Sequence, residues 1–356
     1  MMTIIRTIRM WVLGSVGCCV VMLPGCTGDT NSGSDPAFSA PAPTAILLPD
    51  TGQVTSYTEI FGEDSDYRIN PQSYTKLDAG GQDLPDSAED WTMVRDNVTG
   101  LIWEVKTNDG SIHDKDRTFT WRDARFDYIK DLNERTFGGF ADWRLPYIRE
   151  LSCLVNADRF LPALNTDYFP NTPSDYKTDF WSYDICAWAV QNAWVVRFGG
   201  WGRTFYAEQS LPNHVRAVRG EAAWAQNDYV ENNDGTVTDQ HTGLMWQQDT
   251  AEEQMTWEEA LAYCENLSLA GYNDWRLPNR NELQSLVDKQ PESGRAAINK
   301  AFPDTYPLIY WTSTHDAAPW WPANVWTVFF LDGRTTPDWK DSSQCYVRAV
   351  RGGNGL

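Results

Sequence analysis

Hydrophobic residues recur at helical spacing in some stretches of the chain and alternate with polar residues in others. One stretch, 256–267, places its apolar residues on a single helical face: Trp257, Ala260, Leu261, Cys264 and Leu267. Thr256 lies three residues before Glu259, which is the spacing of a capping box and predicts where this helix begins. Thr120 and Asp123 repeat that spacing earlier in the chain. We therefore predict a helix after each threonine.

A second helix is predicted after each of two prolines. Pro146 and Pro278 suit the first turn of a helix, where the missing N–H of proline is not needed. The apolar residues that follow form one buried stripe per helix: Leu151, Leu154 and Val155, and Leu283, Leu286 and Val287. Later stretches such as "VWTVFFLDGR" (325–334) and "YVRAVRG" (346–352) predict short antiparallel strands. Helices followed by such strands make an α+β fold.

This order of elements occurs twice, because the chain contains a domain-sized duplication. "VRDNVTGLIW" at 94–103 matches "VTDQHTGLMW" at 237–246, and "HVRAVRG" at 214–220 matches "YVRAVRG". The word "DWRLP" begins at 142 and again at 274, and the offset of 132 residues persists to the end of each copy. We predict two tandem domains, at 86–222 and 223–354, preceded by a lead-in segment at 51–85.

The N-terminus predicts export and lipidation. Two arginines precede an apolar run that is too short to cross a bilayer comfortably and ends in Leu-Pro-Gly-Cys. We predict a lipoprotein signal peptide at 1–25, lipidation of Cys26 and a flexible tether rich in Pro, Ser, Gly and Ala at 26–50. An ordinary secretory signal is the alternative. Because Thr27 rather than Asp follows the cysteine, we expect a bacterial outer-membrane protein whose membrane contact is the lipid anchor alone.

Composition and charge exclude some classes of partner. The chain of 356 residues carries a formal net charge of -20, and removal of Arg6 and Arg9 with the signal would leave 27 basic residues against 49 acidic ones, or -22. Such an acidic chain argues against nucleic-acid binding. A hydrophobic content of 42% fits a globular protein, and 18 tryptophans are many for this length.

Four cysteines remain after the signal and the lipidated residue are set aside: Cys153, Cys186, Cys264 and Cys345. An even number in an oxidising compartment predicts two disulfides. Three pairings are possible, and we favour Cys153–Cys186 with Cys264–Cys345 because pairing within a domain requires no interdomain geometry. None of the four has metal-ligand spacing, and with only four histidines a zinc site is not expected.

The DWRLP words contain the most reactive side chains of the repeat. An acid and an arginine beside a tryptophan would suit a polar ligand, or would pin a loop as a buried ion pair. Because both copies keep these residues, we predict a structural role for the whole set: Asp142, Trp143, Arg144, Glu150, Arg216 and Arg219, and Asp274, Trp275, Arg276, Glu282, Arg348 and Arg351.

Known metal and catalytic motifs are not found in the sequence. "ENNDGTVTD" at 231–239 resembles a calcium loop, but the twelfth position counted from Asn232 is Gly243 rather than Glu. A hairpin turn at Asp234-Gly235 is predicted instead. The four histidines, which are His113, His214, His241 and His315, lie in no nucleophile–base pattern. We predict no catalytic residue, no metal and no cofactor.

The ordered motifs TGL-x-W, DWRLP-x-x-x-EL, W-x-S/T and VRAVRG in both copies resemble the DUF1566 domain, also called the Lcl C-terminal domain. This resemblance covers 86–222 and 223–354. It implies a surface-attached bacterial binding module whose fold is related to C-type lectin-like and sulfatase-modifying-factor domains. Lectin-like folds often hold a calcium ion. The namesake adhesin binds sulfated glycans, and the negative charge of this chain argues against the same polyanionic ligand.

Aromatic residues outside the repeated words are the predicted ligand-binding residues. Trp201 in "FGGWGRTF" and Trp320-Trp321 in "AAPWWPAN" lie in loops between predicted strands, and their alternative role is to cover the core or the domain interface. We predict a non-enzymatic envelope lipoprotein that binds a glycan or another surface component. The alternatives are an enzyme or enzyme accessory that acts on envelope polymers through Asp142 and Asp274, and a structural module with protein partners.

Overall fold

The computed structural model describes residues 47–222, 228–289 and 295–353. The predicted signal peptide, the lipidation site Cys26 and the tether up to residue 46 lie outside the described residues.

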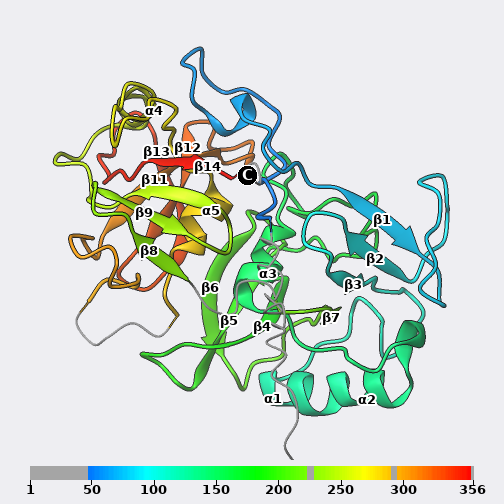
Figure 1. Ribbon diagram of the computed structural model, residues 1–356. Coiled ribbons are helices and arrows are strands. Elements are labelled where there is room, and N and C mark those ends of the chain that lie inside the picture. The colour runs from blue at the N-terminus through cyan, green and yellow to red at the C-terminus, as the bar shows by residue number, and fades with distance from the viewer. Residues whose placement is uncertain (1–46, 223–227, 290–294, 354–356) are drawn as a thin grey trace, which may run out of the picture. The chain divides into compact units, whose positions relative to one another are not determined.

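Repeat 1 consists of two antiparallel sheets and short helical segments (Figure 1). The first sheet has the order β1-β2-β3-β7, with strands at Tyr74–Leu77, Met93–Asp96, Ile102–Glu104 and Val218–Arg219. The second has the order β4-β5-β6, with strands at Asp179–Ile185, Asn192–Arg197 and Arg203–Glu208. The helical segments are α1 (Trp121–Asp123), a π-helical turn (Ala124–Tyr128), α2 (Ile129–Glu134), a 3-10 turn (Phe137–Gly139) and α3 (Ile148–Cys153).

Repeat 2 is built from the same parts. One sheet has the order β14-β10-β9-β8, with strands at Val350–Gly352, Leu244–Gln247, Thr236–Asp239 and Tyr229–Glu231. The other has the order β11-β12-β13, with strands at Ile309–His315, Asn324–Phe329 and Arg334–Trp339. Its helices are α4 (Trp257–Glu265) and α5 (Arg280–Ser285). Since β8 occupies the sheet position that β1 has in repeat 1, residues of the lead-in segment complete the first sheet of repeat 1.

Both predicted first helices are present and begin at the predicted residue. Thr256 and Glu259 form the capping box of α4, and the hydroxyl of Thr120 accepts the backbone N–H of Asp123 at 3.2 Å. The second helices are shorter than predicted. Their N-caps are Tyr147 and Asn279, so Pro146 and Pro278 precede the helix instead of lying in its first turn.

Tryptophans form much of the core, at equivalent positions in the two repeats. The fully buried ones are Trp103, Trp181, Trp194, Trp246, Trp257, Trp275, Trp311 and Trp326. The indole N–H groups of Trp121 and Trp257 donate to the carbonyl oxygens of Ser182 (2.8 Å) and Thr312 (2.9 Å). These bonds satisfy a buried donor and attach the first helix of each repeat to its three-stranded sheet.

The two repeats pack against each other and share one hydrophobic core. The backbone N–H of Thr204 in β6 donates to the hydroxyl of Thr335 in β13 at 2.9 Å, and both threonines follow a Gly-Arg pair. Nearby, Arg280 of α5 donates to the carbonyl of Gly202 at 2.8 Å. Equivalent parts of the repeats therefore meet at the junction, where α3 contacts α5 and β6 contacts β13 (Figure 1).

The residues before β1 pack across both repeats. Asn281 of α5 donates to the carbonyl of Pro49 at 3.0 Å, and Gln72 donates to the carbonyl of Val155 at 2.9 Å. Asp64 is buried and accepts hydrogen bonds from the hydroxyls of Thr51 (2.5 Å) and Thr314 (2.6 Å). This segment is therefore an integral part of the folded unit.

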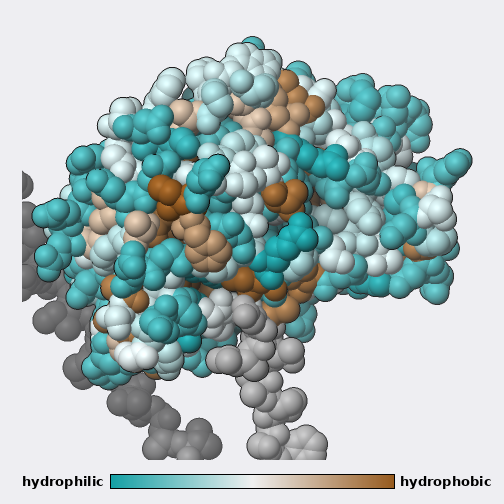
Figure 2. Space-filling model, turned by 90° about the horizontal axis from the view of Figure 1, so that it is seen from above, coloured by the Kyte–Doolittle hydropathy of each residue, from teal (hydrophilic) through white to brown (hydrophobic). Residues whose placement is uncertain are grey.

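The surface visible in Figure 2 is mainly hydrophilic, with small and separate hydrophobic patches. Charged residues make up 22% of the chain, which is close to the usual value for a globular protein. Among the residues that the structure describes, no helix has the length and apolar character needed to cross a membrane.

Candidate functional site

The arginine of each DWRLP word forms a bidentate ion pair with the glutamate of the following helix. Arg144 contacts both carboxylate oxygens of Glu150 at 2.7 Å, and Arg276 contacts those of Glu282 at 2.6 Å. Each glutamate also accepts the backbone N–H of the residue that caps its helix, at 2.8 Å. This second bond makes the residue after the proline the N-cap, which explains the position of the prolines.

The aspartate of each word binds the arginine of the last strand. Asp142 pairs with Arg219 (2.8 and 3.1 Å), and Asp274 pairs with Arg351 (2.7 and 3.1 Å). The two carboxylates are more than half exposed, but neither aspartate lines one of the two cavities described below. The contacts thus connect the DWRLP loop to β7 in one repeat and to β14 in the other.

The remaining residues of the set are buried. Trp143 and Trp275 donate their indole N–H groups to backbone carbonyls of Phe137 (2.9 Å) and Leu269 (3.3 Å). Arg216 donates to the carbonyl of Glu104 at 2.8 Å, and burial lowers the pKa of its guanidinium to about 10. Arg348 donates in the same way to the carbonyl of Gln247, which is the counterpart of Glu104 in repeat 2, at 2.8 Å. The arginines therefore bind the carbonyls at the ends of β3 and β10 inside each repeat.

The prediction of two disulfides is wrong, because all four cysteines are free and buried. Cys264 and Cys345 lie in the same small apolar core of repeat 2, and Cys153 lies in the core shared by the repeats. Burial raises the pKa of the Cys345 thiol to about 12 and raises the pKa of Cys153, Cys186 and Cys264 above the usual value. These thiols fill space as small apolar side chains.

The predicted ligand-binding tryptophans come together at the junction of the repeats. Trp201 lies in the loop before β6, and Trp321 lies in the loop before β12; their ring centroids are 5.7 Å apart. Trp320 packs against Phe160, which in turn contacts Trp201. A cavity of about 350 Å³, which we call the junction pocket, is lined by Trp201, Arg203, Trp321, Asn324, Thr336, Pro337 and Trp339. Trp320 borders the aromatic cluster but does not line the pocket.

The wall of the junction pocket contains polar atoms without a protein partner. They are the indole N–H of Trp201, Nε of Arg203 and the side-chain oxygen of Asn324, each buried and without a hydrogen bond to any described residue. Asn324 is only 6% exposed. Because buried polar groups are normally hydrogen-bonded, unpaired ones in the wall of a cavity indicate a place where a ligand or water binds.

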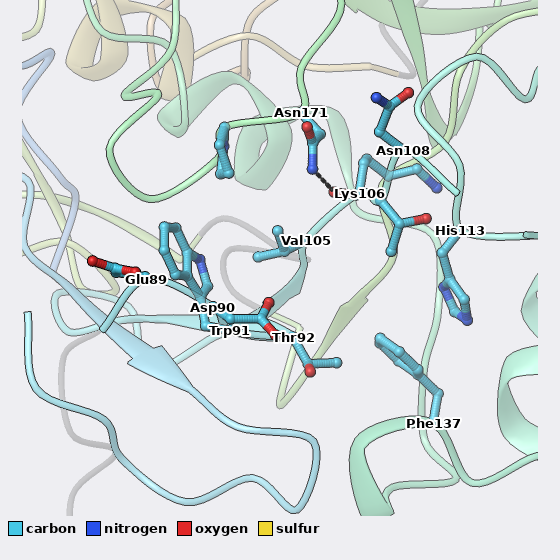
Figure 3. Close-up of a pocket in the computed structure, with 12 residues that line it drawn as sticks. Glu89, Asp90, Trp91, Thr92, Val105, Lys106, Asn108, His113, Phe137 and Asn171 are labelled. Carbon is cyan, nitrogen blue, oxygen red and sulfur yellow. Dashed lines mark hydrogen bonds between the residues drawn. The ribbon is translucent and has the colours of Figure 1, made fainter. Parts of the chain in front are cut away.

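A second cavity, of about 340 Å³, lies within repeat 1 (Figure 3). Trp91 and His113 lie on opposite sides of it, with Val105 between them, and His113 stacks on Phe137 with centroids 4.3 Å apart. At the top, Asn171 donates to the carbonyl of Lys106 at 2.8 Å. We call it the repeat 1 cavity.

A buried charged network lies beside the repeat 1 cavity. The carboxylate of Glu104 contacts Nζ of Lys106 (3.0 Å) and Nδ1 of His113 (3.0 Å) and accepts a hydrogen bond from the hydroxyl of Tyr128. Burial by itself would raise the pKa of Glu104, but Lys106 and His113 lower it to about 2. Burial lowers the pKa of Lys106, whose cation faces Glu104 and Tyr128.

The sequence does not predict a role for Glu104, Lys106 or Tyr128, and His113 matches no catalytic pattern. The length of one segment is nevertheless a sequence signal for this network. Trp103 and Trp121, which have counterparts in repeat 2, enclose 17 residues (104–120), whereas those counterparts, Trp246 and Trp257, enclose 10 (247–256). The longer segment of repeat 1 carries His113 to Glu104.

Metal ligation has no support in the geometry of the described residues, where no three His, Cys, Asp or Glu side chains are placed to hold an ion. The stretch that resembles a calcium loop forms the predicted hairpin turn between β8 and β9. Within it the Asp234 carboxylate accepts the backbone N–H (3.1 Å) and the hydroxyl (2.6 Å) of Thr236.

Comparison with known proteins identifies the repeated unit. A model of the Lcl C-terminal domain family matches residues 92–219 and again residues 235–351. Among curated proteins, none matches the chain significantly. The two matched segments cover more than half of the chain and coincide with the two structural repeats. The chain therefore belongs to the Lcl C-terminal domain family and carries two tandem copies of its domain.

Proposed function

We propose that this protein is a non-enzymatic lipoprotein of the bacterial cell envelope that binds a glycan in the junction pocket. The observation that carries the proposal is the meeting of Trp201 from repeat 1 with Trp321 from repeat 2 in one cavity. Flat indole faces suit the apolar faces of sugar rings, and the unpaired polar atoms of the wall suit sugar hydroxyls.

The envelope location and the finer fold relationship belong to the same proposal. Lipidation at Cys26 would attach the chain to the outer membrane, and the residues up to 46 would act as the tether, which is shorter than predicted because Leu48 and Asp50 are buried in the folded unit. A relationship of each repeat to C-type lectin-like and sulfatase-modifying-factor domains is supported by the family and by the small antiparallel sheets.

The alternative of an enzyme acting on envelope polymers requires Asp142 and Asp274 in an open cleft. Both aspartates are held by bidentate arginine pairs, and the described cavities do not include them. Their geometry therefore favours the binding function, in which the DWRLP words serve as scaffold.

The proposal is tested by screening the mature chain against a panel of soluble glycans and cell-wall fragments and measuring the affinity of each hit. Removal of one indole from the pocket by Trp321→Ala is expected to weaken binding about tenfold, as the loss of about 1.4 kcal/mol of stacking would do. Trp201→Ala is expected to behave similarly.

Trp188→Ala provides a matched control. Trp188 is an exposed tryptophan (40%) in the corresponding loop of repeat 1, and it does not line the junction pocket. Its removal should leave affinity unchanged. Absence of binding to the whole panel, or equal affinities for Trp321→Ala and the wild type, would refute the proposal.

A further inference from the structure

The turns that precede β6 and β13 are equivalent but differ at one residue. The sequence is Trp201-Gly-Arg203 in repeat 1 and Asp332-Gly-Arg334 in repeat 2. In repeat 2 the carboxylate of Asp332 pairs with the guanidinium of Arg334 at 2.6 Å. In repeat 1 the tryptophan replaces this internal acid and lines the junction pocket.

Arg203 consequently lacks the partner that its counterpart has. None of the described carboxylates forms an ion pair with it. Nε lacks a hydrogen bond in Arg203 and in Arg334 alike, so the difference between the two turns is the ion pair with Asp332. Asp179, an acid whose charge reaches Arg203, is held by Arg197 through two contacts at 2.7 and 2.9 Å. Burial lowers the pKa of Arg203, and the neighbouring charges of Arg197 and Arg334 lower it further. An unpaired, partly buried cation is costly, so an anion at this place would be stabilising.

We propose that the ligand of the junction pocket is a saccharide that carries a carboxylate, which binds Arg203 while the sugar ring lies against Trp201 and Trp321. This inference rests on the proposed function. The planar guanidinium fork matches a carboxylate in bidentate geometry. Trp201 thus has two effects, because it removes the internal acid of the turn and contributes a stacking surface.

The charge around the pocket favours one carboxylate over a polyanion. Arg203 is the only ionisable side chain among the seven lining residues, and the chain as a whole carries a net charge of -20. A polyanion would gain one ion pair here and be repelled elsewhere. The remaining unpaired atoms are a donor, the indole N–H of Trp201, and an acceptor, the side-chain oxygen of Asn324. Ring hydroxyls can satisfy both.

The test compares two sugars that differ only at C6. Methyl glucuronide and methyl glucoside are titrated into the mature chain by calorimetry. We expect methyl glucuronide to bind at least about tenfold more tightly than methyl glucoside. Arg203→Gln should abolish this preference, because the uronide loses its ion pair and weakens by at least about tenfold more than the glucoside does. Arg334→Gln, which changes the paired counterpart, should leave both affinities unaltered. Trp201→Asp, which recreates the turn of repeat 2, should abolish the preference and weaken both sugars.

The outcomes separate this inference from the proposed function. If the two sugars bind with equal affinity and Trp321→Ala abolishes the binding of both, the requirement for a carboxylate is overturned but the proposed glycan-binding function is retained. Tighter binding of methyl glucoside 6-sulfate, with steep salt dependence, would overturn it in favour of a sulfate ester. If a larger glycan from the panel is needed to obtain measurable affinity, it is compared with its carboxyl-reduced form, and equal binding of the two again overturns the inference. Failure of every glycan to bind would overturn both proposals.

Discussion

The two repeats keep one scaffold but differ where charge is placed. In the turn before the third strand of the small sheet, repeat 2 pairs the guanidinium of Arg334 with the carboxylate of Asp332, whereas repeat 1 has Trp201 in place of this acid and leaves Arg203 without an ion pair. Both turns lie at the same junction, where the threonines that follow them bond to each other, so the turn forms with or without the ion pair. The difference is what supports the proposed anion-binding role of Arg203 in repeat 1.

A second difference lies beside the repeat 1 cavity. There Glu104 binds Lys106, His113 and Tyr128, while its counterpart Gln247 donates to the hydroxyl of Tyr263 at 2.9 Å. Asp249 stands where repeat 1 has Lys106. Repeat 2 thus forms the same sheet with a neutral pair, and the charged network of repeat 1 is an addition to the scaffold.

The largest expected effect comes from breaking this charged network. Glu104→Gln copies the residue of repeat 2 but leaves the Lys106 ammonium, which is 2% exposed, without a counter-charge. We expect a loss of about 3–5 kcal/mol in the free energy of unfolding. Denaturant unfolding followed by tryptophan fluorescence measures it.

The double variant Glu104→Gln with Lys106→Met is the informative control. It removes both charges and leaves a neutral pair of the new glutamine with Tyr128, like that of Gln247 with Tyr263 in repeat 2, and it should recover most of the lost stability because a neutral pair needs no counter-ion. If the double variant is no more stable than Glu104→Gln, the cost is due to packing rather than to charge. A change below about 1 kcal/mol in Glu104→Gln itself would contradict the network.

The second prediction concerns how the repeats cap α3 and α5. In repeat 1 the carboxylate of Asp184 accepts the backbone N–H of Ile148 at 2.6 Å. In repeat 2 the hydroxyl of Thr314 accepts the equivalent N–H of Arg280 at 2.9 Å and donates to Asp64 of the lead-in segment. Burial raises the pKa of Asp64 to about 7. The carboxylate at the start of α3 thus belongs to repeat 1 itself, whereas the one near the start of α5 in repeat 2 belongs to the lead-in segment.

The pKa of Asp64 makes the stability of this contact depend on pH. Because the pKa of Asp64 in the folded state exceeds its ordinary value of 3.8, protonation favours the folded state below about pH 4, and this contribution is lost as the pH rises through 7. Asp64→Asn removes the buried charge and should be more stable than the wild type by about 2–4 kcal/mol at pH 8. Urea unfolding at pH 4 and pH 8 measures the difference, which should shrink at pH 4. A variant less stable than the wild type at pH 8 would show that Asp64 is charged and well solvated.

Much of this scaffold could be predicted from the sequence, because it depends on local spacing and on repetition. The Thr256–Glu259 capping box and the apolar face of α4 are local signals, and the duplication showed which residues belong to the scaffold. The convergence of Trp201 and Trp321 could not be predicted, since it depends on how β6 and β13 pack. The prediction for the cysteines failed because an even count in a chain that is predicted to be exported does not reveal whether the thiols face each other or fill the core.

The smallest expected effect concerns a feature that the two turns share. Gly202 and Gly333 have φ of +73° and +76°, and a Cβ at either would lie 2.3 Å from Cγ1 of Val155 or Val287. Each Gly→Ala change should therefore cost about 1–3 kcal/mol, by thermal or denaturant unfolding, through backbone strain and overpacking. Only Gly202→Ala should also weaken binding in the junction pocket, because Gly202 is adjacent to both Trp201 and Arg203. Gly333→Ala is the matched control for stability. Equal loss of binding in the two variants would mean that the junction as a whole, rather than the turn of repeat 1, determines the affinity.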